Sequence, residues 1–343
     1  MFIKSLTLLT LAVCASANAQ YTVEILPTPN GGGRATGAGG GQIVGSAFGP
    51  GGGPALWNAP AYQYTNMMPG AFNAAELLGV GGGKQVGYGR VTAGRDHAMM
   101  WSGSANDYVD LDVSTFVTGT AAWATDGVSQ VGVGGYEQNR GHALLWYGTA
   151  QSVVDLHPQG YVHSHAYGVW GDVQIGNLAD FSLPEGPVMW RGTAESMTFL
   201  PLPKGYTNGF AYAIHGDQIV GNAGLPTGAV AVIWNAKTLS FTDLGAGVGH
   251  DTNGVHQVGY SAGRAKMWAG TAQSALDLHQ FLPVGFTESR ALGIDENGVI
   301  VGWASGGQIV VPVAWTPIPE PATIAALGIG VLALCFRRRF RRR

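Results

Sequence analysis

One short cassette recurs along nearly the whole chain and restricts its fold more than any other feature. It consists of a strand-ending glycine, usually preceded by Gln-Ile or Gln-Val, and a tryptophan that follows it. The glycines are Gly45, Gly87, Gly132, Gly176, Gly221, Gly259 and Gly302. The tryptophans are Trp57, Trp101, Trp146, Trp190, Trp234, Trp268 and Trp315. Successive glycines are 38 to 45 residues apart, a period that is typical of repeat proteins.

Each repeat has the pattern of four short strands. A small apolar strand is followed by a turn such as Asn297-Gly298, which favours a hairpin. The glycine cassette, the apolar run into tryptophan and a segment such as Val154-Asp155-Leu156 supply the other three strands. Four strands in this length are typical of a propeller blade, although a solenoid or a string of hairpins is the alternative.

The two ends of the repeat region decide between these alternatives. The last repeat stops at Trp315 without a fourth strand, whereas residues 21–27 form an isolated one that resembles the fourth strand at residues 276–283. Pairing of the N-terminal strand with the last blade would remove an exposed sheet edge. The sequence therefore predicts an all-β fold: a seven-bladed β-propeller of four-stranded blades over residues 20–318, with the last blade closed by the N-terminal strand.

The N-terminus, residues 1–19, is predicted to be a secretory signal peptide. Lys4 supplies the charged start, residues 6–13 are apolar, and Ala17 and Ala19 form an A-x-A cleavage site. Lipidation of Cys14 is the alternative, but Val13 is bulky for such a site. Because Cys14 and Cys335 lie outside residues 20–318, we expect a mature domain without disulfides.

Charge excludes one class of partner. Residues 20–318 carry 11 basic and 20 acidic side chains, so the predicted domain is negatively charged. This balance argues against nucleic acid or an anionic membrane surface as partner.

The C-terminal residues 319–343 have three parts in a fixed order. Pro319-Glu320-Pro321 precedes an apolar run over residues 322–336, and six arginines follow. Fifteen apolar residues span about 22 Å as a helix, short of a hydrocarbon core of roughly 30 Å. The arginines would stay on the cytoplasmic side. A plain tail anchor is one interpretation of this predicted transmembrane helix.

This arrangement resembles the PEP-CTERM sorting signal of Gram-negative bacteria, which an exosortase reads. The resemblance implies cleavage near Pro319, Glu320 and Pro321 by that membrane protease-transpeptidase. It also implies secretion across the inner membrane, transient membrane anchoring, and release to the cell surface or an exopolysaccharide matrix. The Ala/Ser-rich linker common before such motifs is missing, since residues 315–318 run directly into it.

The repeats also resemble a group of bacterial extracellular proteins, of the HAF type, whose units carry a His-Ala dipeptide before an aromatic residue. His97-Ala98 and His142-Ala143 match that pattern, and the other repeats depart from it. The resemblance implies no defined activity. Because His97 and His142 occupy the same repeat position, we expect them to be structural.

The remaining histidines suggest chemistry at only one place. His163-Ser164-His165 is expected in a connection between blades, outside the repeat pattern, and an H-x-H pair is a possible metal ligand. No carboxylate or cysteine lies near it in sequence, so we predict no metal and no cofactor. No catalytic motif was found, so no catalytic residue is assigned.

Function in such a ring is expected on one face, in loops with aromatic and polar side chains. The candidate binding residues there are Tyr161, His163, His165, Tyr206, Glu288 and Arg290. The leading hypothesis is a non-enzymatic, exported module that binds or scaffolds extracellular polysaccharide or a surface protein. The alternative is a polysaccharide or small-molecule lyase in which His163 or His165 pairs with Glu288 as base and electrophile.

Overall fold

A computed structural model describes residues 20–91, 94–116, 118–136, 140–179 and 186–318. The described chain is all-β, with mostly antiparallel sheets and four short 3-10 helices within these residues. Hence the all-β prediction is confirmed. The larger of two compact units comprises residues 23–316 and contains almost all of the strands.

The strands follow the predicted repeat. The first strand of each repeat is β2 (Gly33–Gly39), β6 (Ala74–Gly81), β10 (Gly119–Thr125), β14 (His163–Trp170), β18 (Gly209–His215), β22 (Val248–Thr252) or β26 (Glu288–Ile294). The second is β3 (Gln42–Ala47), β7 (Lys84–Arg90), β11 (Gln130–Tyr136), β15 (Val173–Ala179), β19 (Gln218–Leu225), β23 (Gln257–Ser261) or β27 (Ile300–Gly306). The third is β4 (Gly53–Asn58), β8 (Asp96–Ser104), β12 (Arg140–Trp146), β16 (Gly186–Trp190), β20 (Gly228–Asn235), β24 (Arg264–Trp268) or β28 (Ile309–Pro317).

The fourth strands are shorter. They are β5 (Gln63–Asn66), β9 (Asp107–Asp110), β13 (Val154–Asp155), β17 (Thr198–Phe199), β21 (Phe241–Ala246) and β25 (Leu276–Asp277). The 3-10 helices η2 (Ala150–Ser152), η3 (Ala194–Ser196) and η4 (Ala272–Ser274) begin at the alanine of a Gly-Thr-Ala segment between the third and fourth strands, and η5 (Leu278–Phe281) follows β25. In the remaining sheet the strand order is β1-β28-β27-β26, with β1 (Tyr21–Ile25) beside β28.

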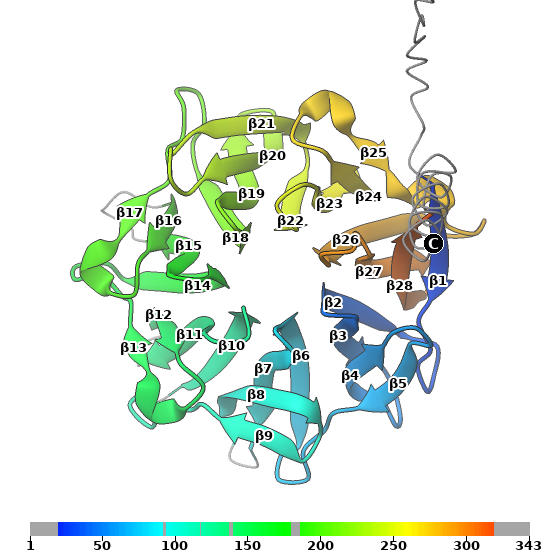
Figure 1. Cartoon of the computed structure of the whole chain (residues 1–343), viewed down its shortest axis with the longest axis horizontal. Helices are drawn as coiled ribbons and strands as arrows, with labels where there is room; N and C mark the ends of the chain where they lie inside the picture. The colour runs from blue at the N-terminus through cyan, green and yellow to red at the C-terminus, as the bar shows by residue number, and fades with distance from the viewer. Residues whose placement is uncertain (1–19, 92–93, 117, 137–139, 180–185, 319–343) are drawn as a thin grey trace, which may run out of the picture. The chain divides into compact units, whose positions relative to one another are not determined.

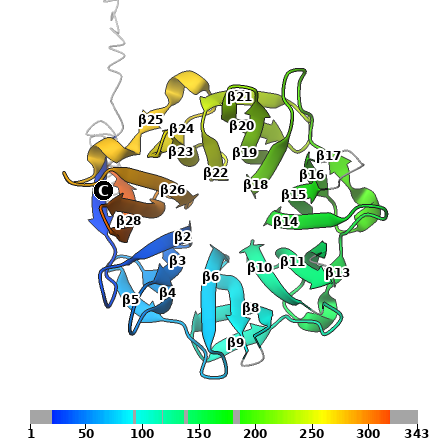
Figure 2. The ribbon, with the colours of Figure 1, turned by 180° about the vertical axis from the view of Figure 1, so that it is seen from behind.

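Within residues 23–316 the sheets surround a common centre (Figure 1). The first strand of each repeat contacts the first strand of the next, and β26 in turn contacts β2. These strands are innermost from either side of the ring (Figures 1 and 2). β6–β9 and β10–β13 form one larger sheet, joined by a parallel pairing of Gly119 with Asp96.

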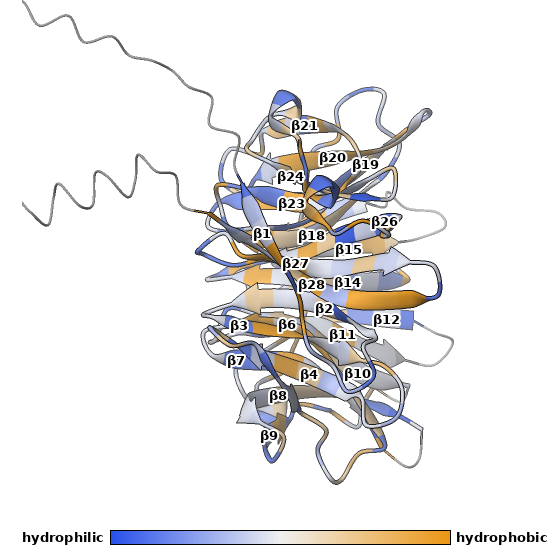
Figure 3. Ribbon diagram, turned by 90° about the vertical axis from the view of Figure 1, so that its right-hand side faces the viewer, coloured by the Kyte–Doolittle hydropathy of each residue, from blue (hydrophilic) through white to orange (hydrophobic). Residues whose placement is uncertain are grey.

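The core of each sheet lies around its repeat tryptophan. All the repeat tryptophans are at most 1% exposed. Apolar residues lie along the strands, and hydrophilic residues are common at the turns (Figure 3). The cassette glutamine is also buried in several repeats, where its side chain accepts the N–H two residues after the tryptophan; one example is Gln85, which accepts from Gly103 at 2.8 Å.

The cassette glycine is required by a close approach of backbones. A Cβ atom placed on any of these glycines would lie 1.8 to 2.1 Å from a carbonyl oxygen of the innermost strand. For Gly221 that oxygen belongs to Phe210. No side chain fits there, which gives a steric reason for the glycine that marks every repeat.

Two predicted segments, residues 1–19 and 319–343, lie outside the described residues. Within the part of the chain that is described, no helix has the length and apolar character needed to cross a membrane.

Candidate functional site

Every innermost strand has a β-bulge at the same position. Its pairing with the second strand skips one residue directly after the residue that faces the cassette glycine. The skipped residues are Thr36, Leu78, Trp123, Tyr167, Tyr212, His250 and Leu292. A bulge redirects a side chain relative to the regular pleat and is common beside functional sites.

All of these bulge residues line one central cavity. Its volume is about 530 Å³, and innermost strands from every sheet of the ring contribute to its wall. That volume lies within the usual range of small-molecule sites, roughly 300–1,000 Å³. The bulges therefore place one side chain from each repeat around a common space.

Aromatic rings occupy one side of that cavity, and we call them the aromatic arc: Trp123, Tyr167, Tyr212 and His250. The ring centroids are 5.9 Å apart for Trp123 and Tyr167, 5.9 Å for Tyr167 and Tyr212, and 5.4 Å for Tyr212 and His250. Trp123 is 37% exposed, so its ring is open to a ligand. Thr36, Leu78 and Leu292 occupy the other side, so the lining is chemically asymmetric.

A second aromatic pair lies toward the β-hairpin turns that follow the innermost strands. The rings of Trp170 and His215, both cavity-lining, are 3.9 Å apart, and Trp170 is 41% exposed. Burial lowers the pKa of His215. Burial and the charge of Arg290 lower the pKa of His250 to about 4, so its ring is neutral at neutral pH.

The charged residues that line the cavity are all acidic: Asp126, Asp251, Asp295 and Glu296. Their carboxylates accept hydrogen bonds from backbone N–H groups, partly across sheet boundaries. Asp251 Oδ2 accepts from Ile294 at 2.9 Å, and Asp126 Oδ2 accepts from Gly171 at 3.0 Å. Burial raises the pKa of Asp251 to about 7 despite these bonds.

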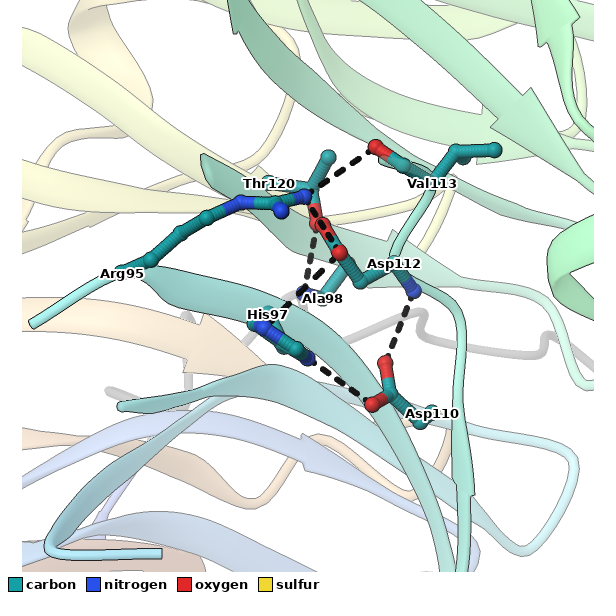
Figure 4. A network of polar contacts seen from close by, with 7 residues as sticks. All are labelled: Arg95, His97, Ala98, Asp110, Asp112, Val113 and Thr120. Carbon is teal, nitrogen blue, oxygen red and sulfur yellow. Dashed lines mark hydrogen bonds and ion pairs between the residues drawn. The ribbon is translucent and has the colours of Figure 1, made fainter. Parts of the chain in front are cut away.

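A separate polar network joins the repeat of β6–β9 to the repeat that follows it (Figure 4). His97 Nδ1 lies 2.8 Å from Asp110, and Arg95 pairs with Asp112. Thr120 donates to Asp112 at 2.7 Å and accepts the N–H of Ala98 at 2.9 Å. The network thus connects the third strand of one repeat, the segment after its fourth strand and the first strand of the next.

The same connection recurs in two other repeats with histidine in place of Asp112. His142 Nδ1 lies 2.8 Å from Asp155, the counterpart of the His97–Asp110 contact. His157 and His279 lie 2.8 Å from the hydroxyls of Ser164 and Ser289, respectively. The periodic histidines therefore join strands and sheets, in agreement with the structural role predicted for His97 and His142.

The expected position of His163-Ser164-His165 in a connection was wrong. These residues begin β14, because Ser164 occupies the repeat position of Thr120 and must pair with the preceding sheet. His163 Nδ1 accepts the N–H of Gly141 at 3.1 Å. His165 stacks on Tyr167 with centroids 5.8 Å apart and has a lowered pKa because of burial and the nearby His163.

The other candidate residues are distributed around the ring. Tyr161 packs against the core beneath β14, and its carbonyl oxygen lies 3.0 Å from His157 Nε2. Tyr206 donates to Asp243 at 2.7 Å and packs on Phe241. The structure therefore does not bring Tyr206 together with the histidines of β14.

Glu288 and Arg290 lie on β26. The sheets of β18 and β22 separate β26 from β14 along the ring, so the proposed pairing of Glu288 with His163 or His165 is not formed. The Arg290 guanidinium stacks over Tyr260 at 4.1 Å and lies 5.4 Å from the ring of Trp303. Arg290 is thus held next to the aromatic arc at its His250 end.

Several predictions concern residues for which the structure gives no description. The cleavage residues Ala17 and Ala19 and the motif Pro319, Glu320 and Pro321 lie outside the described residues. Within the described ranges, no group of three or more His, Cys, Asp or Glu side chains is placed to hold a metal ion.

The sequence prediction missed the aromatic arc. Tyr167 and Tyr212 stand in small apolar strands, as in Ala-Tyr-Gly and Ala-Tyr-Ala, where an aromatic residue normally indicates core. The available signal was positional, since an aromatic residue follows the same repeat alanine in three successive repeats: Trp123, Tyr167 and Tyr212.

Comparison with protein families identifies the C-terminus. The model of the PEP-CTERM protein-sorting motif matches residues 317–339. The matched residues do not include the repeats, so their resemblance to HAF-type proteins stays a prediction. No curated protein matches the chain.

Solved structures show the fold. Puromycin hydrolase has a TM-score of 0.56 at 12% identity, over 84% of this chain and 52% of that chain. The acylaminoacyl peptidase of Pyrococcus horikoshii has a TM-score of 0.53 at 10% identity, over 82% of this chain and 50% of that chain. The chain thus spans about half the length of these enzymes. It has an all-β, propeller-like fold and a PEP-CTERM sorting motif at its C-terminus.

Proposed function

We propose that residues 20–318 form a seven-bladed β-propeller closed by the N-terminal strand, and that its central cavity binds a saccharide of an extracellular polysaccharide. The PEP-CTERM motif implies an exported protein that an exosortase processes, with transient anchoring through the C-terminus. The proposal places the processed protein at the cell surface or in an extracellular matrix, where polysaccharide is abundant.

The aromatic arc carries the binding proposal. The apolar C–H faces of a pyranose ring stack on aromatic side chains, and its hydroxyls need polar partners nearby. The cavity offers both: Trp123, Tyr167 and Tyr212 present rings, and Asp126 and Glu296 present carboxylate oxygens. Its volume of about 530 Å³ suits one or two sugar units of a longer chain.

Isothermal titration of the full-length chain against a panel of oligosaccharides tests this proposal. Trp123→Ala should weaken binding by roughly tenfold, which corresponds to a loss of about 1.4 kcal/mol of stacking on the exposed ring. Tyr147→Ala is the matched control, because Tyr147 is 50% exposed and lies directly after β12, away from the cavity. Equal loss in both variants, or capture of a surface protein that Trp123→Ala leaves intact, would contradict a saccharide site.

Export has its own test. Deletion of residues 319–343 should abolish exosortase processing and transient anchoring, whereas Tyr147→Ala should be processed normally. Immunoblots of membrane and released fractions report both steps. Normal processing of the truncated chain would remove the basis for placing the protein outside the cell.

A lyase is the second candidate, and one observation favours it. Asp251 lines the cavity with a pKa raised by burial to about 7, which suits a general acid or base at neutral pH. This carboxyl replaces the separated pair of histidine and Glu288 as the acid–base candidate. Turnover of a polysaccharide that Asp251→Asn abolishes, with binding retained, would establish the enzyme instead of the binding module.

A further inference from the structure

The charge lining the central cavity restricts its ligand beyond the aromatic rings. Asp126, Asp251, Asp295 and Glu296 line it, and no lysine or arginine does so among the described residues. The ion pairs of the described chain lie elsewhere, for example Lys237 with Asp217 and Arg191 with Asp172. The cavity carboxylates are hydrogen-bonded by neutral backbone N–H groups, so their charge is not compensated by a cation of the protein.

A second observation in the same cavity points to a ligand that donates hydrogen bonds. His250 lines the cavity, and its Nε2 atom is buried without a partner among the described residues. A neutral imidazole has one nitrogen that accepts a hydrogen bond. With a pKa of about 4, His250 stays neutral near pH 7 and can offer that acceptor. A ligand N–H or O–H group would supply the missing partner.

The aromatic arc also favours a positively charged ligand. The face of an aromatic ring is negative and attracts a cation that lies within about 6 Å of its centroid. Trp123, Tyr167 and Tyr212 present such rings beside the carboxylates. Aromatic faces combined with uncompensated carboxylates favour an ammonium group over a neutral amide or an anion.

We infer that the cavity selects a saccharide carrying a free, protonated amino group, such as a deacetylated amino sugar. The inference rests on the proposed saccharide function and adds the chemical class of the sugar. In the bound state the ammonium lies near Glu296 and the arc, while the pyranose face stacks on Trp123 or Tyr212. An N-acetyl group in its place removes the charge and adds bulk.

Two oligomers that differ only in acetylation test the inference. The full-length chain is titrated with a β-1,4-linked glucosamine tetramer and with its fully N-acetylated counterpart, at mildly acidic pH where the amine carries its proton. The glucosamine tetramer should bind at least about tenfold more tightly, since a charge-assisted bond is the stronger kind. Added salt should weaken only the charged tetramer.

Charge-removing variants locate the effect. Glu296→Gln should weaken binding of the glucosamine tetramer roughly threefold to tenfold and leave the acetylated tetramer unchanged. Glu296 is exposed, so this variant keeps the fold. Asp107→Asn on the outer strand β9 changes the net charge equally and should have no effect.

The outcomes separate the inference from the proposed function. Equal or tighter binding of the acetylated tetramer overturns the amino-group inference and leaves the saccharide proposal standing. Equal weakening by Asp107→Asn and Glu296→Gln also overturns the inference, because the effect would then be one of net charge. Failure of both tetramers to bind overturns the inference and the saccharide proposal together.

Discussion

Single hydroxyl groups join neighbouring sheets of the ring. The Ser164 hydroxyl accepts a hydrogen bond from the Ala143 N–H at 2.8 Å and forms a second hydrogen bond with His157 Nδ1 at 2.8 Å. Its side chain is 0% exposed, so no water can replace it. Thr120 and Ser289 repeat the arrangement at other boundaries. A hydroxyl at this position accepts from one strand and donates to the next connection, which an apolar residue cannot do.

Removing that hydroxyl should therefore destabilise the fold. Ser164→Ala removes the partner of the Ala143 N–H and of His157 Nδ1, and an unsatisfied buried polar group costs about 1–3 kcal/mol. Ser164→Thr restores the group used naturally at Thr120 and should recover most of the loss. Urea unfolding of the three proteins measures the difference. A urea midpoint for Ser164→Ala equal to that of the unsubstituted protein would show that these hydrogen bonds add no stability.

His157 makes stability depend on pH. Burial, and then the charge of His142 stacked at 3.8 Å, lower the pKa of His157 below its usual 6.5. The unfolded chain therefore takes up this proton more readily than the folded chain. The stabilisation is complete above pH 6.5 and is lost as pH falls through the lowered pKa.

Replacing His157 with a residue that does not titrate isolates its contribution to the pH dependence of stability. His157→Gln should lose less stability than the unsubstituted protein when the pH is lowered from neutral to mildly acidic values. His165, His215 and His250 also have lowered pKa values and remain in both proteins, so only the difference between the two proteins is informative. Identical pH profiles of the unfolding midpoint would contradict a contribution from His157.

At the scale of a strand, the cassette glycine and the β-bulge act together to set the geometry of the innermost strand. The glycine admits a carbonyl of the innermost strand, and the residue two positions further along that strand is displaced from the regular pairing. In the fifth repeat Gly221 admits the Phe210 carbonyl, and Tyr212 is the displaced residue. The residue that marks the repeat in sequence therefore also positions the residue that lines the cavity.

Gly221→Ala should disrupt both the close approach of the two strands and the position of Tyr212. The new Cβ would lie 1.8 Å from the Phe210 oxygen, so the strands must separate, at a cost of several kcal/mol as in overpacked cores. Gly70→Ala is the control, since a Cβ there meets nothing within 4 Å. Thermal unfolding measures the effect. Similar melting temperatures for the two variants would show that this approach of the backbones is not tight.

The strand pattern could be predicted from sequence, but the bulges could not. A fixed period of glycine and tryptophan predicts where strands begin and end, because both residues have steric roles within one repeat. An extra residue such as Tyr167 has no local signature, since alternation of small and large residues continues through it. For the same reason the sequence placed ligand contacts in loops such as that of Tyr206, whereas the cavity is built from strand interiors.

At the scale of the whole repeat region, the decisive relations join residues far apart in sequence. Asp251 with Ile294, Asn177 with Gly209 and Thr36 with Leu77 each cross a sheet boundary. No single-sequence pattern specifies such pairs, since each depends on how adjacent sheets stack. The pairing of β1 with β28 is an exception, because the last repeat lacks a fourth strand of its own and the N-terminus supplies a matching segment.

The proposed closure predicts that the N-terminal segment stabilises the entire ring. Leu26 is 1% exposed, packs in one cluster with Val301 and Ala314, and donates its N–H to Pro312 at 2.9 Å. Leu26→Ala should cost about 2–5 kcal/mol, the usual range for a buried leucine. Because the proposed closure leaves the ring no free end from which to unfold, the loss should shift one cooperative transition.

Tryptophan fluorescence measures that transition, since a buried tryptophan marks every sheet. Val284→Ala, at a fully exposed position, should leave the midpoint unchanged. If the N-terminal strand were only an attached edge, Leu26→Ala would instead produce an early, small fluorescence change followed by an unshifted main transition. The two curves differ in shape as well as midpoint, so the measurement distinguishes a closing strand from an appended one.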